Sequence, residues 1–298
     1  MDMTIRTAPL FKYTSAKVAE TIVKNATIRY SSPVLFDDPL DVARSFDLGF
    51  PLEKLEAALV EEILKFIEKP DLRLMNLNPL FYLLGILFIN GVPKESIERF
   101  KNELPALIRE GTQSSQKYLD ELNRIWKELV PQMRILCFSD KKDIMPLWAT
   151  YGDTHKGAVL EFLPQETTDS PWLLANPVQY SDEKMLIATP KEWARSILGV
   201  ERIDYKKIFE RYGNVKTTNW SYQEEVRVFS FKRASDTGMY TDYKFSPLDL
   251  RAINFGYQTN KSDMQNVVNL LINDFEHVEA YQLAINSESR KIIYNKVK

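Results

Sequence analysis

The chain is poor in the residues that build disulfides, zinc sites and phosphate-binding loops. Its 298 residues include one cysteine, Cys137, and two histidines. A single cysteine excludes an internal disulfide, which fits a reducing compartment. With so few cysteine and histidine ligands we expect no zinc site, and the site residues assigned below include no metal ligand. Neither standard glycine-rich phosphate-binding pattern is present.

The chain also lacks an excess of charge and a long apolar run. Its formal net charge is −2, so the overall balance does not call for nucleic acid or an anionic membrane as a partner. The longest apolar run, Pro79 to Ile89, is too short to span a bilayer. The segment Met1 to Arg6 has no apolar stretch of the signal-peptide type. We therefore expect a cytoplasmic protein with no membrane partner.

Strand and helix patterns follow one another without regular alternation. Short β-type runs occur at 10–14, 133–139 and 158–162, while helical periodicity dominates 52–130. This order predicts an α+β fold, with a mixed or antiparallel sheet core and an inserted all-helical subdomain. The expected division is residues 1–50 for the first part of the core, 51–131 for the helical insertion and 132–298 for the remainder. The insertion carries no catalytic constellation, so we assign it to packing or to recognition of a partner protein.

One stretch combines an amide, a carboxylate and a guanidinium at alternate positions. From Gln223 onward the residues favour a strand, which would place Gln223, Glu225 and Arg227 on one face. An arginine beside a glutamate favours the ionised carboxylate, and glutamine both donates and accepts hydrogen bonds. On spacing alone, an ion pair on an exposed strand, which stabilises little, is the simpler interpretation. A functional site is the alternative.

Five motifs in order resemble the bacterial family called domain of unknown function 2971. The family's pieces are a start of the type Leu-Tyr-Lys-Tyr, then Phe-Asn-Asp-Pro-Phe-Glu, Cys-Phe-Ser, Met-Trp-x-x-Tyr-x-x-x-His-x-Gly and Lys-x-x-x-Trp-x-x-Glu-x-Glu-x-Arg. The corresponding segments here begin at Leu10, Phe36, Cys137, Met145 and Lys216. The resemblance covers nearly the whole chain except the helical block. The chain departs from the family where Asp replaces Asn at position 37 and where Gln replaces the first Glu at 223.

A second resemblance suggests an activity. Gln223-x-Glu225 is similar to the catalytic Gln/Glu-x-Glu motif of ADP-ribosyltransferases, which use NAD as a substrate. The start of the chain resembles the DNA-modifying toxin branch of that superfamily, although Lys12 stands where that branch has a histidine. Together with the first resemblance, this implies an NAD-dependent ADP-ribosyltransferase-like enzyme in a toxin or phage-defence setting, acting on a nucleic acid or a protein.

The resemblance implies a role for each candidate residue. The catalytic candidates are Glu225, which would stabilise the oxocarbenium-like transition state, Gln223, which would orient the acceptor, and Arg227. Arg227 would hold Glu225 ionised or bind a phosphate in bidentate fashion. The remaining candidates would contact NAD through its phosphates, ribose or nicotinamide ring. They are Lys12, Tyr13, Asp38, Trp148, Tyr151, His155 and Lys156.

Two other functions remain open at this point. In the first, the same motifs form a non-catalytic module that binds a ligand or a partner in a defence system. In the second, Asp38, Asp41 and Glu225 gather Mg²⁺ in an enzyme that acts on nucleic acids. Nicotinamide release from NAD separates the transferase from the binding module, and a requirement for a divalent metal identifies the third function.

Overall fold

A computed structural model describes residues 6–42, 48–71, 73–76, 78–91, 93–183, 186, 188–203, 212–286, 288–289 and 291–298. The chain forms two compact units. The first comprises residues 1–42, 129–182 and 214–298, and the second comprises 43–128 and 183–213. The first unit contains a mixed sheet of ten strands and the second is helical, so the predicted α+β class is confirmed.

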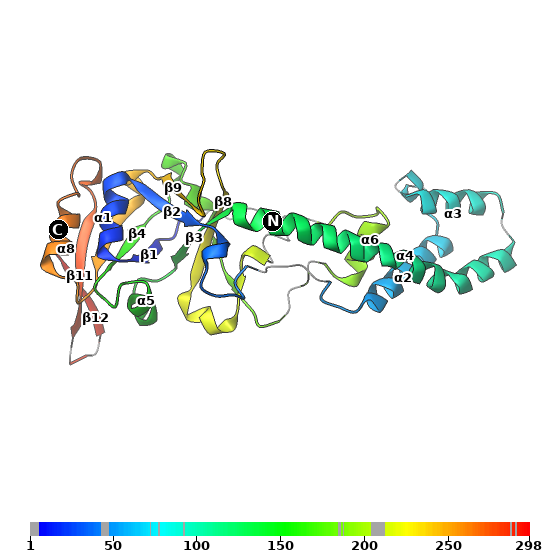
Figure 1. The fold of residues 1–298 in the computed structure, drawn as a ribbon, viewed down its shortest axis with the longest axis horizontal. Coiled ribbons are helices and arrows are strands. Elements are labelled where there is room, and N and C mark those ends of the chain that lie inside the picture. Colours follow the sequence, from blue (N-terminus) through cyan, green and yellow to red (C-terminus); the bar gives the residue numbers. More distant parts are fainter. Residues whose placement is uncertain are drawn as a thin grey trace. The chain divides into compact units, whose positions relative to one another are not determined.

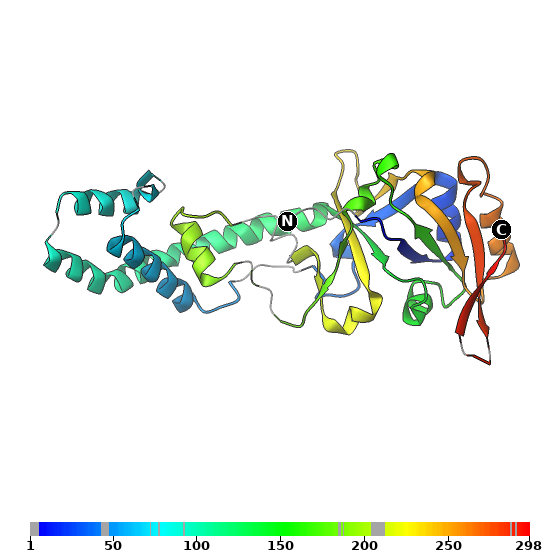
Figure 2. The same ribbon diagram turned by 180° about the vertical axis from the view of Figure 1, so that it is seen from behind.

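The sheet of the first unit follows the order β12-β11-β10-β4-β1-β3-β2-β9, with β8 paired to β3 and β5. Strands β10 and β11 are parallel and the other pairs of this sheet are antiparallel. Figure 2 shows the β11–β12 pair at one edge, in orange and red. The strands are β1 (Leu10–Thr14), β2 (Thr27–Ser31), β3 (Met133–Ser139), β4 (Ala158–Phe162), β5 (Asn176–Pro177), β8 (Glu225–Phe231), β9 (Tyr240–Lys244), β10 (Leu250–Phe255), β11 (Glu279–Asn286) and β12 (Lys291–Lys296). A separate parallel pair joins β6 (Gln179–Tyr180) to β7 (Val215–Lys216).

Helices cover the sheet because its strands present apolar side chains on both faces. Helices α1 (Ala16–Asn25) and α8 (Lys261–Val268) pack in one core with Leu10, Leu160 and Val226 (Figure 1). Ser15 caps α1 by accepting a hydrogen bond from the backbone N–H of Val18. A second cluster, which includes Phe11, Tyr13, Leu147, Trp148 and Val159, brings α5 (Met145–Thr150) against β1 and β4.

Two short 3-10 helices lie next to segments that line the pocket described in the next section. One spans Pro33–Leu35 and leads into Phe36, and the other spans Thr218–Gln223 directly before β8. The remaining 3-10 helices are Leu74–Asn76, Val130–Gln132, Glu166–Thr168, Pro171–Leu174, Pro247–Asp249 and Asn273–Phe275. In the described residues, no helix combines the length and the apolar character needed to cross a membrane.

The second unit contains α2 (Leu52–Glu68), α3 (Pro79–Ile89), α6 (Pro190–Ile197) and all of α4 (Lys94–Leu129) except its last residue. Helix α6 belongs here because Arg195 donates to the buried carboxylate of Glu62 on α2, at 2.8 Å. The expected division placed 183–213 with the sheet core, whereas the structure assigns this segment to the helical unit. The other boundaries lie at 42/43 and 128/129, where the sequence suggested 50/51 and 131/132.

Candidate functional site

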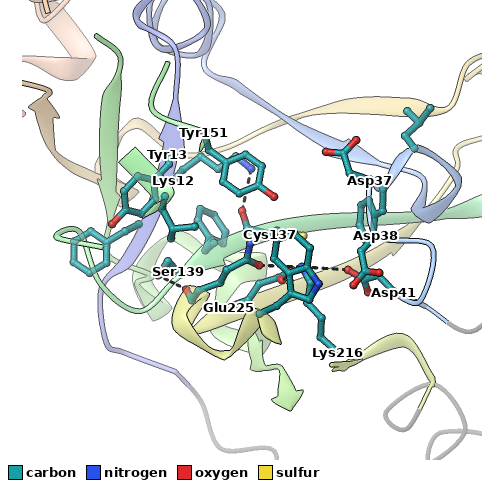
Figure 3. Close-up of a pocket in the computed structure, with 17 residues that line it drawn as sticks. Lys12, Tyr13, Asp37, Asp38, Asp41, Cys137, Ser139, Tyr151, Lys216 and Glu225 are labelled. Carbon is teal, nitrogen blue, oxygen red and sulfur yellow. Dashed lines mark hydrogen bonds and ion pairs between the residues drawn. The ribbon is translucent and has the colours of Figure 1, made fainter. Parts of the chain in front are cut away.

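A pocket of about 200 Å³ opens in the first unit between segments that are distant in the sequence (Figure 3). Its walls come from β1, the loop after the first 3-10 helix, the end of β3, α5 with the residue that follows it, and the segment 216–225. The lining residues are Phe11, Lys12, Tyr13, Leu35, Phe36, Asp37, Asp38, Asp41, Cys137, Phe138, Ser139, Leu147, Tyr151, Lys216, Trp220, Gln223 and Glu225.

Lys12 lies where strands β1 and β3 separate. The two strands pair at Phe11 opposite Ser139. Beyond that point the Lys12 ammonium group donates to the backbone carbonyl of Cys137, at 3.0 Å. Burial lowers the pKa of Lys12, and the nearby Cys137 and Glu225 oppose that shift. In the described structure Lys12 has no carboxylate within ion-pair distance, so its remaining donors are available to a ligand.

Glu225 and Arg227 form the centre of a buried ion-pair cluster. Arg227 Nε donates to Glu225 Oε1 at 2.7 Å, and Lys216 Nζ donates to Glu225 Oε2 at 3.0 Å. The two terminal nitrogens of Arg227 bind Asp41 in bidentate fashion, at 2.8 and 2.6 Å. Glu225 is 5% exposed and Arg227 is fully buried. The interpretation as an ion pair on an exposed strand is therefore wrong, because the first four residues of β8 are buried and the pair lies among them.

The cluster holds Glu225 in its ionised form. Burial alone would raise the pKa of this carboxyl group, but the charges of Arg227 and Lys216 outweigh burial and lower it to about 2. Burial also lowers the pKa of Lys216, while Glu225 and Asp41 reverse that effect and leave it raised. The result is a fixed carboxylate at the wall of the pocket, with each oxygen in contact with one cation.

Gln223 lines the pocket beside Glu225, but it does not lie on the strand. The sequence predicted a strand from Gln223 onward, whereas this residue ends the 3-10 helix and β8 begins at Glu225. Between them, Glu224 has a left-handed backbone with φ of 42°. Gln223 is 4% exposed, and its Oε1 accepts from Lys216 Nζ at 2.9 Å. Among the described residues its Nε2 has no acceptor in hydrogen-bonding geometry, although the side chain lies close enough to the Tyr151 hydroxyl to oppose the rise in the pKa of that tyrosine.

Two tyrosines contribute to the pocket in different ways. The Tyr13 hydroxyl accepts from the backbone N–H of Ile144 at 3.1 Å and donates to the carbonyl of Lys141 at 2.8 Å. Tyr13 thus lends its ring to the pocket, while its hydroxyl fixes the loop before α5. Tyr151 is 43% exposed, and burial of its hydroxyl raises its pKa against the effect of Lys216 and Gln223. Tyr151 is therefore the tyrosine whose ring is open to a ligand.

Three of the predicted NAD contacts do not line the pocket. Trp148 is fully buried and donates to the Lys142 carbonyl at 2.8 Å, so it is a core residue. The His155 ring stacks on Trp148 with a centroid distance of 6.5 Å. Lys156 is exposed outside the pocket. Residues 153–155, which all have a left-handed backbone, turn the chain back against α5. The His155 ring therefore meets Trp148 instead of entering the pocket.

Arg227 is also absent from the pocket wall, because it lies behind Glu225 and acts through it. The structure adds Lys216 and Asp41, to which the sequence gave no role in binding NAD. Lys216 contacts Gln223, Glu225 and Asp41, the last at 3.4 Å. The available signal was that Lys216 begins the Lys-x-x-x-Trp-x-x-Glu-x-Glu-x-Arg motif, which also contains Glu225 and Arg227.

The proposed magnesium ligands are arranged differently from a metal site. The described residues contain no group of three or more His, Cys, Asp or Glu side chains that could hold a metal ion. Asp41 binds Arg227 and Lys216, and Glu225 binds the same two cations. These carboxylates therefore have their charge compensated by protein groups.

Comparison with known proteins adds no assignment to this geometry. The two resemblances stated above remain predictions from the motifs. The chain matches no protein-family model, no curated protein and no solved structure.

Proposed function

We propose that this protein is an NAD-dependent enzyme of the ADP-ribosyltransferase type, with Glu225 as its catalytic carboxylate. The observation that carries the proposal is that Glu225, held ionised, shares one pocket with Gln223 and Lys12. These residues come from segments more than two hundred positions apart. The Gln223-x-Glu225 motif and the start of the chain, the two segments that carried the resemblance, thus contribute to one pocket.

The reaction breaks the bond between nicotinamide and ribose. The electron pair of that bond leaves with the pyridinium nitrogen, so nicotinamide departs neutral and positive charge develops on the ribose. An acceptor then donates an electron pair to the anomeric carbon and loses a proton. A carboxylate fixed near that carbon stabilises the transition state more than the ground state.

Glu225 suits this role because its position is set before the substrate arrives. Arg227 and Lys216 each occupy one of its oxygens, and an ionised carboxylate still offers further lone pairs to a ribose hydroxyl. The two cations also reduce the negative charge that Glu225 presents. We therefore assign most of its effect to orientation and to the hydrogen bond with the 2′-hydroxyl.

The rest of the pocket fits the nicotinamide end of NAD. Pockets that enclose a whole drug-sized ligand hold roughly 300–1,000 Å³. A cavity of about 200 Å³ therefore suits the nicotinamide ring and its ribose, with the remainder of NAD outside. Tyr151 would stack on the ring, and Lys12, the cation without an ion pair in the described pocket, would contact the ribose. The acceptor is a nucleic acid or a protein.

The test is release of nicotinamide from NAD by the purified protein, with and without cell lysate as a source of acceptor. We expect Glu225→Gln to abolish release. The matched control is Glu161→Gln, because Glu161 is another buried glutamate, on β4, that pairs with Lys142 outside the pocket. If neither nicotinamide release nor an NAD-dependent rise in melting temperature occurs in the unmodified protein, the proposal fails.

A non-catalytic binding module is the second candidate, and one observation favours it. The charge of Glu225 is compensated on both oxygens, as in sites that bind without reacting. In that case NAD or another ligand would stabilise the protein without turnover, and the helical unit would bind a partner protein. We place either function in the cytoplasm, and the toxin or phage-defence setting rests on family resemblance alone.

A further inference from the structure

Two buried polar atoms of pocket-lining residues have no hydrogen-bond partner among the residues that the structure describes. The side-chain oxygen Asp38 Oδ2 is an acceptor, and the side-chain nitrogen Gln223 Nε2 is a donor. Both belong to residues that line the pocket. Leaving such groups unsatisfied costs free energy, so a ligand that satisfies them gains affinity. Residues of the pocket wall thus carry one acceptor and one donor that no described protein group satisfies.

Asp38 is fixed by the turn in which it lies. Its Oδ1 accepts from the backbone N–H of Leu40 at 2.9 Å, and its carbonyl accepts from the N–H of Asp41 at 3.1 Å. One carboxylate oxygen is therefore committed to the turn and the other is not. Figure 3 shows Asp38 and Asp37 on the side of the pocket opposite Lys12 and Tyr13.

Gln223 is fixed with the same precision. Its Oε1 accepts from Lys216, and its backbone carbonyl accepts from the Ser139 hydroxyl at 2.7 Å. The hydrogen bond from Lys216 identifies Oε1 as the acceptor end of the amide. The donor end, Nε2, is therefore the one left to bind a ligand. Gln223 can therefore offer a ligand only N–H donors.

We infer that the pocket selects a carboxamide over the corresponding carboxylate, and that Asp38 determines this specificity. A carboxamide carries one oxygen for Gln223 and one NH₂ group for Asp38. A carboxylate has no N–H group for Asp38 and adds a second negative charge beside it. This inference rests on the proposed function only in taking the ligand to be NAD, whose nicotinamide ring carries such a carboxamide.

The experiment compares NAD with nicotinic acid adenine dinucleotide, which differs in that one group. Binding of each is measured by calorimetry on the full-length protein, independently of turnover. We expect NAD to bind at least about tenfold more tightly, since one like-charge contact in a partly desolvated site is worth about 1.4 kcal/mol or more.

The variant Asp38→Asn retains the oxygen that binds Leu40 N–H and replaces the free oxygen with an NH₂ group. Its preference for NAD should fall at least about fivefold, toward equal binding or reversal. Asp37→Asn is the matched control. Asp37 is exposed at the same pocket, and its charge should change the preference by less than about threefold because water screens it.

Each outcome decides one of the two claims. Equal affinities in the unmodified protein, an unchanged preference in Asp38→Asn, or no binding of either dinucleotide would overturn the inference. Nicotinamide release with equal affinities would leave the proposed function intact. Selective binding without nicotinamide release would retain the inference and reject NAD cleavage.

Discussion

At the residue scale, the sequence singled out several residues that line the pocket, but not all of them. Gln223 and Glu225 were found because a motif joined them, and Lys12 because it lay on a predicted strand. Trp148 and His155 were misassigned because a motif reports which residues recur together, not which of them pack in the core. No local pattern could show that Asp41, far from β8 in the sequence, binds Arg227.

The ionisation of Glu225 gives a prediction about pH. Its pKa is lowered from an ordinary value of 4.5 to about 2, so the folded state binds this proton less readily than the unfolded chain. The associated stability, about 3 kcal/mol, is therefore complete above the ordinary value. It is lost as pH falls from 4.5 toward 2.

Urea denaturation at pH 6 and at pH 3 measures this loss as a change in the free energy of unfolding. Glu225→Gln removes the titrating group, so the difference between the two pH values should shrink. A variant with an undiminished difference would show that Glu225 is not held ionised by its neighbours.

At the element scale, regular strands were predictable and their junctions were not. The runs predicted at Leu10–Thr14, Met133–Ser139 and Ala158–Phe162 are β1, β3 and β4 with the same bounds. These runs are apolar and bounded by turns, so their local preference and their burial agree. In contrast, the helical periodicity over 52–130 did not show that residues 94–129 form one helix, α4, with Pro105 inside it.

The junction before β8 shows why the strand start was missed. Glu224 adopts a left-handed conformation that propensity does not favour for glutamate, and tertiary contacts of Gln223 and Glu225 on either side fix it. We expect a β-branched residue to be poorly tolerated there and glycine to be accepted.

Glu224→Val should therefore lower the free energy of unfolding by about 1–2 kcal/mol more than Glu224→Gly. Both substitutions remove the same exposed ion pair with Lys141, so the comparison isolates the backbone effect. Equal stabilities in urea denaturation would contradict the left-handed assignment.

At the scale of the whole molecule, the chain leaves its sheet unit twice and returns twice. The first excursion, 43–128, was visible as a block of helical periodicity. The second, 183–213, was not, because its attachment to the helical unit depends on a contact between residues 133 positions apart, Glu62 and Arg195. Sequence periodicity reports the element but not the unit to which it belongs.

The Glu62–Arg195 pair provides a test of that division. Glu62 is 7% exposed, and in the described structure Arg195→Met would leave it paired with Lys65, at 3.0 Å. We expect a loss of about 1–3 kcal/mol, since a buried carboxylate loses a charged hydrogen bond. Hydrogen exchange should accelerate in α2 and α6.

The amides of β1, β3 and β4 serve as the internal control. They belong to the other unit, so their exchange should be unchanged by Arg195→Met. Uniform acceleration across both units would contradict the division.

The central claim is that the pocket of the sheet unit cleaves NAD and that Glu225 is the group responsible. The most direct measurement follows NAD labelled in its nicotinamide ring and counts the free nicotinamide formed per protein molecule. The account predicts multiple turnovers in the presence of lysate, retained in Glu161→Gln and absent in Glu225→Gln. Nicotinamide release that persists undiminished in folded Glu225→Gln protein would contradict it.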